Sequence, residues 1–258
     1  MLIMENVSAI VLAAGKGTRL NHGQPSELPK VMYKICGKPM LEYTLKTLEN
    51  ININDIVLVI GYKAEMIKNY FGNRYKYALQ KEQKGTGHAV KCAEKAVDPT
   101  NEHILVIQGD DSAFYSPDTI VNLMSAHIKG RAKVSLLTLK HPNPRELGRI
   151  VRDKKGGIVA IKEKEVLTPA ERKINEINTG TYCFEALWLW ENIKKLKPSA
   201  TGKGELILPD LIKIAVDKKD KVSAHTITDH EEWIGINKPE QLKLANEVME
   251  KKLRRLKL

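Results

Sequence analysis

The sequence has little of what extracellular and membrane proteins are built from. Its three cysteines, Cys36, Cys92 and Cys183, are scattered and form no CxxC pair, which argues against a disulfide framework and a zinc ribbon. No apolar run approaches the roughly 20 residues of a membrane-spanning helix. The apolar residues 1–4 are followed at once by Glu5, so they are too few for a secretory leader. We therefore expect a cytoplasmic protein with free thiols and no membrane span.

Aromatic residues are also scarce, at 5%, whereas the net charge is +11. This charge suits an anionic partner, such as a nucleotide, a sugar phosphate or a nucleic acid. However, the chain has 33 lysines against 9 arginines, and sequence-specific readers of nucleic acids depend more on arginine and aromatic side chains. We therefore expect no specific nucleic-acid partner, and binding of an anionic polymer stays as a minority alternative.

The order of the apolar segments predicts an α/β fold with a mostly parallel, Rossmann-like central sheet and helices on both faces. The first half alternates predicted strands at 7–13, 55–61, 77–80 and 103–107 with helices at 39–49, 63–70 and 87–97. After residue 130 the predicted strands are 134–139, 149–152, 158–161 and 179–184, with helices at 187–196, 209–216 and from 239. This second half indicates a smaller β lobe added to the first sheet. No linker rich in Ser and Pro separates the halves, so we expect one domain over residues 5–258.

A glycine-rich loop follows the first predicted strand, with the sequence AAGKGTR over residues 13–19 and Pro-Lys at 29–30. Glycines at this place let the backbone N–H groups approach a phosphate. The dinucleotide-binding fingerprint fails because position 20 is Leu20, and the Walker A pattern fails because Lys16 precedes Gly17. What remains is a phosphate-binding loop with two cations, Arg19 and Lys30, within reach of a polyphosphate.

These residues resemble the signature of the sugar-phosphate nucleotidyltransferases, and further motifs sharpen the resemblance. The segment QKEQKGTGHA at 80–89 is similar to the base-binding segment of bacterial N-acetylglucosamine-1-phosphate uridylyltransferases. The same family order continues with GRIVR at 148–152, Glu163, EINTG at 176–180 and GIN at 235–237. The similarity covers roughly residues 7–246. It implies a GT-A-like nucleotidyltransferase fold with a nucleotide-binding half at 5–112, a sugar-binding half at 113–237 and a C-terminal helix at 238–258.

The resemblance also implies a role for individual residues. Arg19 and Lys30 are expected to be catalytic and to hold the triphosphate of UTP. Asp110 and Asn237 are expected to hold Mg²⁺. The nucleotide-binding residues are expected to be Ala13, Ala14, Gly15, Gly17, Thr18, Gln80, Gly85 and Thr86. The sugar-1-phosphate is expected to contact Gly148, Glu163, Asn178 and Thr179.

The implied reaction is Mg²⁺-dependent transfer of UMP from UTP to N-acetylglucosamine-1-phosphate, giving UDP-N-acetylglucosamine and pyrophosphate. The sugar phosphate is already an anion, so catalysis needs no general base and depends on bringing two anions together. The alternatives are transfer to glucose-1-phosphate or another sugar phosphate, and a non-catalytic sugar-nucleotide-binding regulator on the same fold.

Three features depart from the family pattern. The ten residues between Arg19 and Lys30 make that loop longer than usual. Asp111 stands where the family has an apolar residue. The hexapeptide repeats of the family's bifunctional members are not found in this sequence, so we expect no acetyltransferase activity and no trimer built by that element.

Overall fold

The computed structural model describes residues 4–144, 147–199 and 204–255. Its strands are β1 (Val7–Ala13), β2 (Lys34–Ile35), β3 (Lys38–Pro39), β4 (Asp55–Ile60), β5 (Lys76–Leu79), β6 (His103–Gln108), β7 (Val134–Lys140), β8 (Arg149–Arg152), β9 (Ile158–Lys162), β10 (Glu176–Glu185) and β11 (Val222–Ile227). Its α-helices are α1 (Met40–Asn50), α2 (Ala64–Phe71), α3 (Thr86–Cys92), α4 (Pro117–Gly130), α5 (Ala186–Ile193), α6 (Asp210–Asp217) and α7 (Pro239–Arg255). Five short 3₁₀ helices are η1 (Thr18–Asn21), η2 (Lys30–Met32), η3 (Lys164–Val166), η4 (Glu171–Lys173) and η5 (His230–Glu232).

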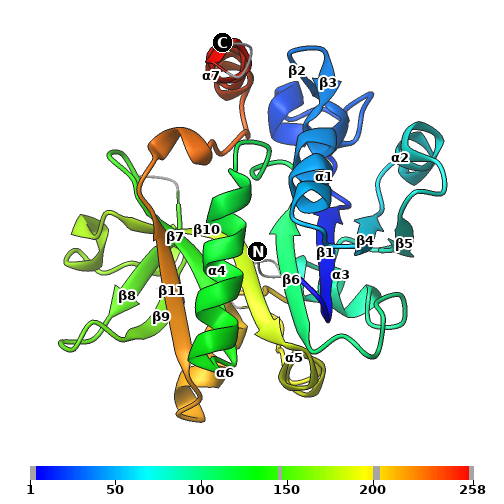
Figure 1. The fold of residues 1–258 in the computed structure, drawn as a ribbon. Coiled ribbons are helices and arrows are strands. Elements are labelled where there is room, and N and C mark those ends of the chain that lie inside the picture. Colours follow the sequence, from blue (N-terminus) through cyan, green and yellow to red (C-terminus); the bar gives the residue numbers. More distant parts are fainter. Residues whose placement is uncertain (1–3, 145–146, 200–203, 256–258) are drawn as a thin grey trace.

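One sheet of nine strands runs through the described part of the chain, in the order β11-β7-β10-β6-β1-β4-β5, with β8 paired to β10 and β9 paired to β8 (Figure 1). The pairs β1–β4, β1–β6, β4–β5 and β7–β11 are parallel. The strand β10 is antiparallel to its neighbours β6, β7 and β8. The mostly parallel sheet predicted from the sequence is confirmed, with β10 as the antiparallel member that joins the two halves.

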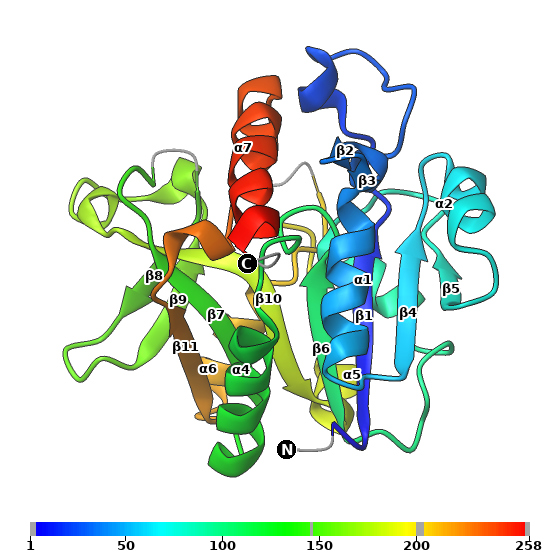
Figure 2. The ribbon, with the colours of Figure 1, turned by 45° about the horizontal axis from the view of Figure 1, so that its top comes forward.

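Helices cover both faces of this sheet, as predicted (Figures 1 and 2). Alternate residues of the buried strand β1 point to opposite faces, so Ala9 and Val11 belong to one apolar cluster and Ile10 and Leu12 to the other. The first cluster includes side chains from α1, α2 and α4, and the second includes side chains from α3, α5 and α6. A third cluster seats α7 against the segment around Ile35 and Phe114.

Some elements differ from the sequence-based expectation. The helix α4 and the edge strand β11 were not predicted, and α3 ends at Cys92 although a helix to residue 97 was expected. The signals for α4 were local: Ser116 caps its first turn by accepting a hydrogen bond from the Thr119 N–H, and Pro117 occupies the first helical position.

The sheet brings three strand ends to one edge. In the paired registers Leu12 of β1 lies beside Gln108 of β6, and Ala13 lies beside Ile60 of β4. Because ligands of such sheets bind beyond the carboxyl ends of the strands, this edge is where a site is expected. Among the described residues, no helix is long and apolar enough to cross a membrane.

Two histidines lie at the opposite end of the sheet. The ring of His127 in α4 is completely buried and lies 5.2 Å, centroid to centroid, from the ring of His103. Its Nδ1 shares a hydrogen bond of 2.9 Å with the Ser135 hydroxyl, whereas its Nε2 has no hydrogen-bond partner. Burial, with a smaller effect of His103, lowers the pKa of His127 to about 3. The folded protein therefore holds this imidazole neutral.

This burial predicts a loss of stability in mild acid. Below the ordinary His pKa of about 6.5 the unfolded chain binds a proton at residue 127 that the folded chain does not, so stability falls as the pH drops. Between pH 7 and pH 5 this group alone should lower the free energy of unfolding by about 2 kcal/mol. Urea denaturation of the wild type and of His127→Phe at both pH values checks it: the variant should lose about 2 kcal/mol less. An equal loss in both proteins would contradict the assignment.

Candidate active site

The glycine-rich loop and the Lys30 backbone lie against each other. The Lys30 N–H donates a hydrogen bond of 3.2 Å to the Gly15 carbonyl. Gly17 has a φ of +69°, and a Cβ atom there would lie 3.2 Å from the Lys30 Cα. Only glycine combines this backbone conformation with such a close approach at low cost. The long loop after Arg19 therefore returns to the glycine-rich segment, and Lys30 lies beside it despite the ten intervening residues.

The Lys30 ammonium group lies among three oxygen-bearing side chains. It forms an ion pair with the Asp110 carboxylate and donates a hydrogen bond of 3.0 Å to the Asn237 Oδ1. The Asp111 Oδ1 is 4.0 Å from the same nitrogen. The side chains of Lys30 and Asp110 are only 14% and 13% exposed. Three residues expected to act together, at positions 30, 110 and 237, are thus brought together by the fold.

Burial and charge act in opposite directions on this group. Burial alone would lower the pKa of Lys30, but the carboxylates of Asp110 and Asp111 outweigh it and raise the pKa above the usual lysine value. Burial, followed by the charge of Asp110, raises the pKa of Asp111 to about 7. The neighbouring Asp110 and burial therefore disfavour the charged form of Asp111, even with Lys30 close by.

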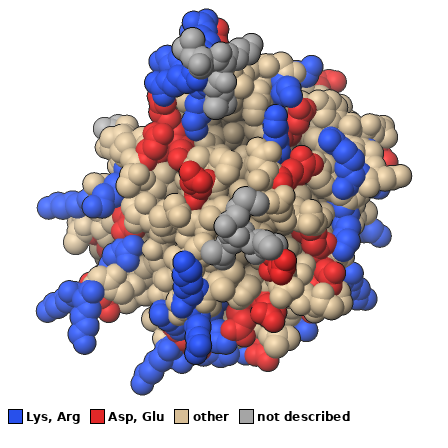
Figure 3. All heavy atoms as spheres, in the orientation of Figure 1, with Lys and Arg blue, Asp and Glu red and all other residues tan. Residues whose placement is uncertain are grey.

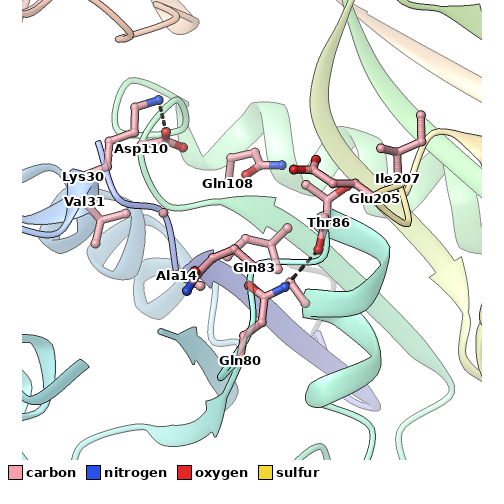
Figure 4. Close-up of a pocket in the computed structure, with 14 residues that line it drawn as sticks. Ala14, Lys30, Val31, Gln80, Gln83, Thr86, Gln108, Asp110, Glu205 and Ile207 are labelled. Atoms are coloured by element: carbon pink, nitrogen blue, oxygen red, sulfur yellow. Dashed lines mark hydrogen bonds and ion pairs between the residues drawn. The ribbon is translucent and has the colours of Figure 1, made fainter. Parts of the chain in front are cut away.

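A cavity of about 250 Å³ opens next to this cluster (Figure 4). Its lining includes five residues expected to contact the nucleotide, namely Ala14, Gly15, Gln80, Gly85 and Thr86, together with Lys30 and Asp110. Ala13 is the buried last residue of β1 and does not line it. Thr18 begins η1, and Arg19 of the same turn is exposed, with no hydrogen bond or ion pair to any described residue.

The buried Gln80 side chain has a fixed orientation at the base of this cavity. Its Nε2 donates to the Gly85 carbonyl at 3.0 Å and lies 3.1 Å from the His88 Nδ1. Both hydrogens of the amide nitrogen are used in this way, so the Oε1 acceptor, which bonds to no described residue, is left for a ligand. A donor such as the N3–H of a pyrimidine imide matches that acceptor.

A distant segment closes the cavity on the side of α3. The Leu206 N–H donates to the Lys84 carbonyl, and the Leu206 carbonyl accepts from the Gly87 N–H, both at 2.8 Å. The Thr86 hydroxyl also accepts from the Leu208 N–H at 2.9 Å. These three hydrogen bonds hold the segment around Leu206 against the start of α3, and its neighbours Glu205 and Ile207 therefore line the cavity.

The residues expected to bind the sugar phosphate gather directly before β8, directly after β9 and on β10. A Cβ atom on Gly148 would lie 3.5 Å from both carboxylate oxygens of Glu163, and the Asn178 N–H donates to the Gly148 carbonyl at 3.3 Å. Burial, then the charges of Glu165 and Asp210, raises the pKa of Glu163. The Thr179 hydroxyl is buried and donates to the Leu137 carbonyl at 3.1 Å. The side chain of Thr179 is thus occupied within the fold, and its contact with a sugar stays a prediction.

Several cavity residues were not anticipated from the sequence. Gln108 stands directly before the Gly109-Asp110 pair, lines the cavity and packs against Gly180 of β10, so it lies between the cavity and the sugar-binding group. Its position at a strand end was a signal that could have identified it. Gln83, within the 80–89 motif, also lines the cavity. Glu205 and Ile207 carried no sequence signal, because only tertiary contacts bring them there.

The donor set fits a hard divalent cation. Asp110 and Asn237 offer a carboxylate and an amide oxygen, and both contact the same ammonium group, so their oxygens converge on one point charge. No group of three or more His, Cys, Asp or Glu side chains forms a metal centre in the part of the chain that the structure describes. Mg²⁺ commonly takes few protein oxygens and completes its shell with water and phosphate.

Positive charge outside the site is dispersed. On the face drawn in Figure 3, Lys and Arg side chains lie around the edges with Asp and Glu among them, and they form no continuous basic surface. This face therefore lacks the basic stripe typical of a nucleic-acid interface.

Comparison with known proteins places this chain in one family. The Nucleotidyl transferase family profile matches residues 8–252. The bifunctional protein GlmU of Halalkalibacterium halodurans is 38% identical over 250 residues, which cover 97% of this chain and 54% of that protein. GlmU of Enterococcus faecalis is 39% identical over 250 residues, with 97% and 53% covered. The chain therefore spans about half the length of the curated relatives it matches.

A solved structure shares the fold. It is a putative glucose-1-phosphate thymidylyltransferase from Bacillus anthracis in complex with a sucrose, with a TM-score of 0.78, 24% identity and 94% of each chain covered. The chain belongs to the nucleotidyl transferase family, in agreement with the resemblance drawn from the motifs. Within that family, it matches the GlmU proteins at 37–39% identity.

The contact between Gly85 and Leu206 gives a first test of the cavity wall. Gly85 has a φ of +95°, and a Cβ atom there would collide with the Leu206 carbonyl oxygen. Backbone strain and overpacking together should make Gly85→Ala less stable by about 2 kcal/mol or more. Gly130→Ala is the control: Gly130 ends α4, and a Cβ atom there would make only an ordinary contact of 3.8 Å with the Lys221 Nζ, so alanine should be neutral or slightly stabilising there. Thermal unfolding of both variants checks the difference.

Proposed function

We propose that this protein transfers UMP from UTP to N-acetylglucosamine-1-phosphate in a Mg²⁺-dependent reaction, which gives UDP-N-acetylglucosamine and pyrophosphate. The observation that carries the proposal is the convergence of Lys30, Asp110 and Asn237 at the rim of a cavity lined by the glycine-rich loop and Gln80. Membership of the nucleotidyl transferase family and the similarity to GlmU support it.

The proposed mechanism assigns two tasks to the chain. The first is to bring together two anions, the sugar-1-phosphate and the triphosphate, which the cationic loop and Lys30 make favourable. The second is to neutralise the charge that grows on the pyrophosphate as it leaves. An oxygen of the sugar phosphate attacks the α-phosphorus of UTP, and the bond between the α-phosphorus and its bridging oxygen breaks. Because the attacking oxygen already carries charge, no side chain has to remove a proton.

Different residues of the chain would bind the phosphates, the base and the sugar. The N–H groups and small side chains of the glycine-rich loop let the phosphates approach the backbone. Lys30, at the start of η2 beside this loop, would contact the same phosphates. The Gln80 Oε1 would accept the N3–H of uracil. When bound by Asp110 and Asn237, Mg²⁺ would supply charge neutralisation at the phosphate oxygens. Glu163 and the Asn178 amide would bond to sugar hydroxyls.

A pyrophosphate-release panel tests the reaction and its substrates together. The purified protein is given UTP, dTTP or CTP, each with N-acetylglucosamine-1-phosphate, glucose-1-phosphate or glucosamine-1-phosphate, in Mg²⁺ and in EDTA. The proposal expects the fastest release with UTP and N-acetylglucosamine-1-phosphate, and none in EDTA. Preference for another sugar phosphate would keep nucleotidyl transfer and reject the acceptor. Nucleotide binding without pyrophosphate release would favour a non-catalytic regulator.

Removing the charge of Lys30 or of Asp110 should lower the turnover rate more than the stability of the fold. We expect Lys30→Ala and Asp110→Ala to lower kcat by roughly 10²–10³-fold, because each removes a contribution to charge neutralisation in the transition state. The control is Lys46→Ala, which removes an exposed lysine of α1 and should leave kcat within about twofold. Steady-state kinetics and thermal unfolding are measured on all three variants. Near-wild-type kcat for either cluster variant would contradict the proposed site.

Gln80 should determine which pyrimidine is accepted. Cytosine has an acceptor where uracil has N3–H, so CTP would meet the Gln80 Oε1 with two acceptors facing each other. The expected result for Gln80→Met is a loss of preference for UTP over CTP by a factor of about ten or more, mainly through slower reaction of UTP. The ratio of kcat/KM for the two nucleotides measures it. An unchanged ratio would show that another group reads the base.

A further inference from the structure

The Lys30 ammonium group occupies a position that a free cation would also favour. Its nitrogen contacts the Asp110 carboxylate, lies 3.0 Å from the Asn237 Oδ1 and 4.0 Å from the Asp111 Oδ1. These oxygens come from two distant segments, the loop after β6 and the loop before α7, and no other cationic side chain among the described residues contacts them. The ammonium group thus acts as the counter-ion of this oxygen set.

The Asp111 side chain and the Asn237 backbone are held in place by neighbours other than Lys30. The Asp111 Oδ1 accepts a hydrogen bond of 3.3 Å from the Ile236 N–H. The Asn237 N–H donates to the Gln241 Oε1 at 2.8 Å, which fixes this residue to the first turn of α7. Because these contacts do not involve the lysine, Asp111 and Asn237 should keep their positions when the ammonium group leaves.

A divalent cation and the lysine cannot use the same oxygens together. Mg²⁺ binds oxygen at about 2.0–2.1 Å, and two cations sharing one carboxylate would repel each other strongly in a site so little exposed to water. We infer that Asp110, Asp111 and Asn237 form one cation site which Lys30 fills in the free protein, so that a divalent cation enters only by displacing the lysine. This inference rests on the proposed function in taking Asp110 and Asn237 as cation donors.

The displacement has a consequence for the lysine itself. Lys30 also lines the neighbouring cavity, and Figure 4 shows its side chain extending to Asp110 along the rim of that cavity. Once released, its ammonium group is free to contact phosphates there. Entry of the divalent cation and availability of Lys30 for the triphosphate are therefore one coupled event. Asp111 takes part as a third donor, which an apolar residue at this position would not supply.

The decisive experiment measures metal affinity without nucleotide. Mn²⁺ is titrated into the wild type and into Lys30→Met, and free Mn²⁺ is followed by EPR. Loss of a charge-assisted contact that the metal would otherwise have to break should tighten binding by at least about tenfold in Lys30→Met. Unchanged or weaker binding by this variant would overturn the inference.

Two further variants separate competition from general electrostatics. Arg19→Gln removes a positive charge that acts on Lys30 and Asp111 through space but has no contact with the carboxylates, and it should change Mn²⁺ affinity by less than about threefold. An effect as large as that of Lys30→Met would assign the gain to net charge and reject displacement. Asp111→Asn should weaken Mn²⁺ binding, and unaltered binding would remove Asp111 from the donor set.

A measurement on the wild type observes the displacement in the unaltered site. In protein labelled with ¹⁵N at lysine Nζ, the Lys30 ammonium signal is assigned by its absence in Lys30→Met. Adding Mg²⁺ alone should shift this signal and speed its hydrogen exchange with water, because its partners in the fold are lost. A signal that does not respond at saturating Mg²⁺ would refute displacement. Pyrophosphate release plays no part in these readouts, so the displacement and the proposed reaction can fail separately.

Discussion

The candidate site is organised around one electrostatic contact, the ion pair between Lys30 and Asp110. It joins η2, after the glycine-rich loop, to the loop that follows β6, and the Asn237 side chain connects both to the start of α7. Three segments far apart in the sequence are thus fixed around one charged group. Burying either ion alone would be costly, so the opposite charges of the lysine and the carboxylates offset the cost of burying one another.

The central sheet explains why the segments can meet. Parallel strands β1, β4 and β6 deliver their carboxyl ends to the same edge, so the loops that follow them are neighbours irrespective of sequence distance. The antiparallel strand β10 then places Asn178 and Thr179 beside this edge, at an irregularity in its pairing with β7. Bulges of this kind redirect side chains at binding sites, and here the irregularity separates the residues proposed to bind the sugar from the regular strand that follows.

Much of this architecture was predictable because its signals are local. The buried strands, the helices on both faces and the glycine-rich loop follow from apolar periodicity and from glycine chemistry. Gln80, Gly85 and Thr86 were located through a motif, and the structure brings them to one cavity. The strand β11 was missed because its residues are only half buried and lack a clear alternation. Glu205 and Ile207 were not accessible to sequence reasoning, since hydrogen bonds from Leu206 to the loop before α3 and to the start of that helix place them.

The hydrogen bonds of Leu206 also connect the two halves of the chain that the sequence suggests. The sequence suggests a nucleotide-binding half that ends near residue 112, yet one wall of its cavity is supplied by residues 205–207. Strand β6 likewise has β10 as its neighbour on one side. A fragment cut after the first half would expose that strand edge to water and leave the cavity open on one side. We therefore expect the two halves to unfold together, and neither half to fold as a separate module.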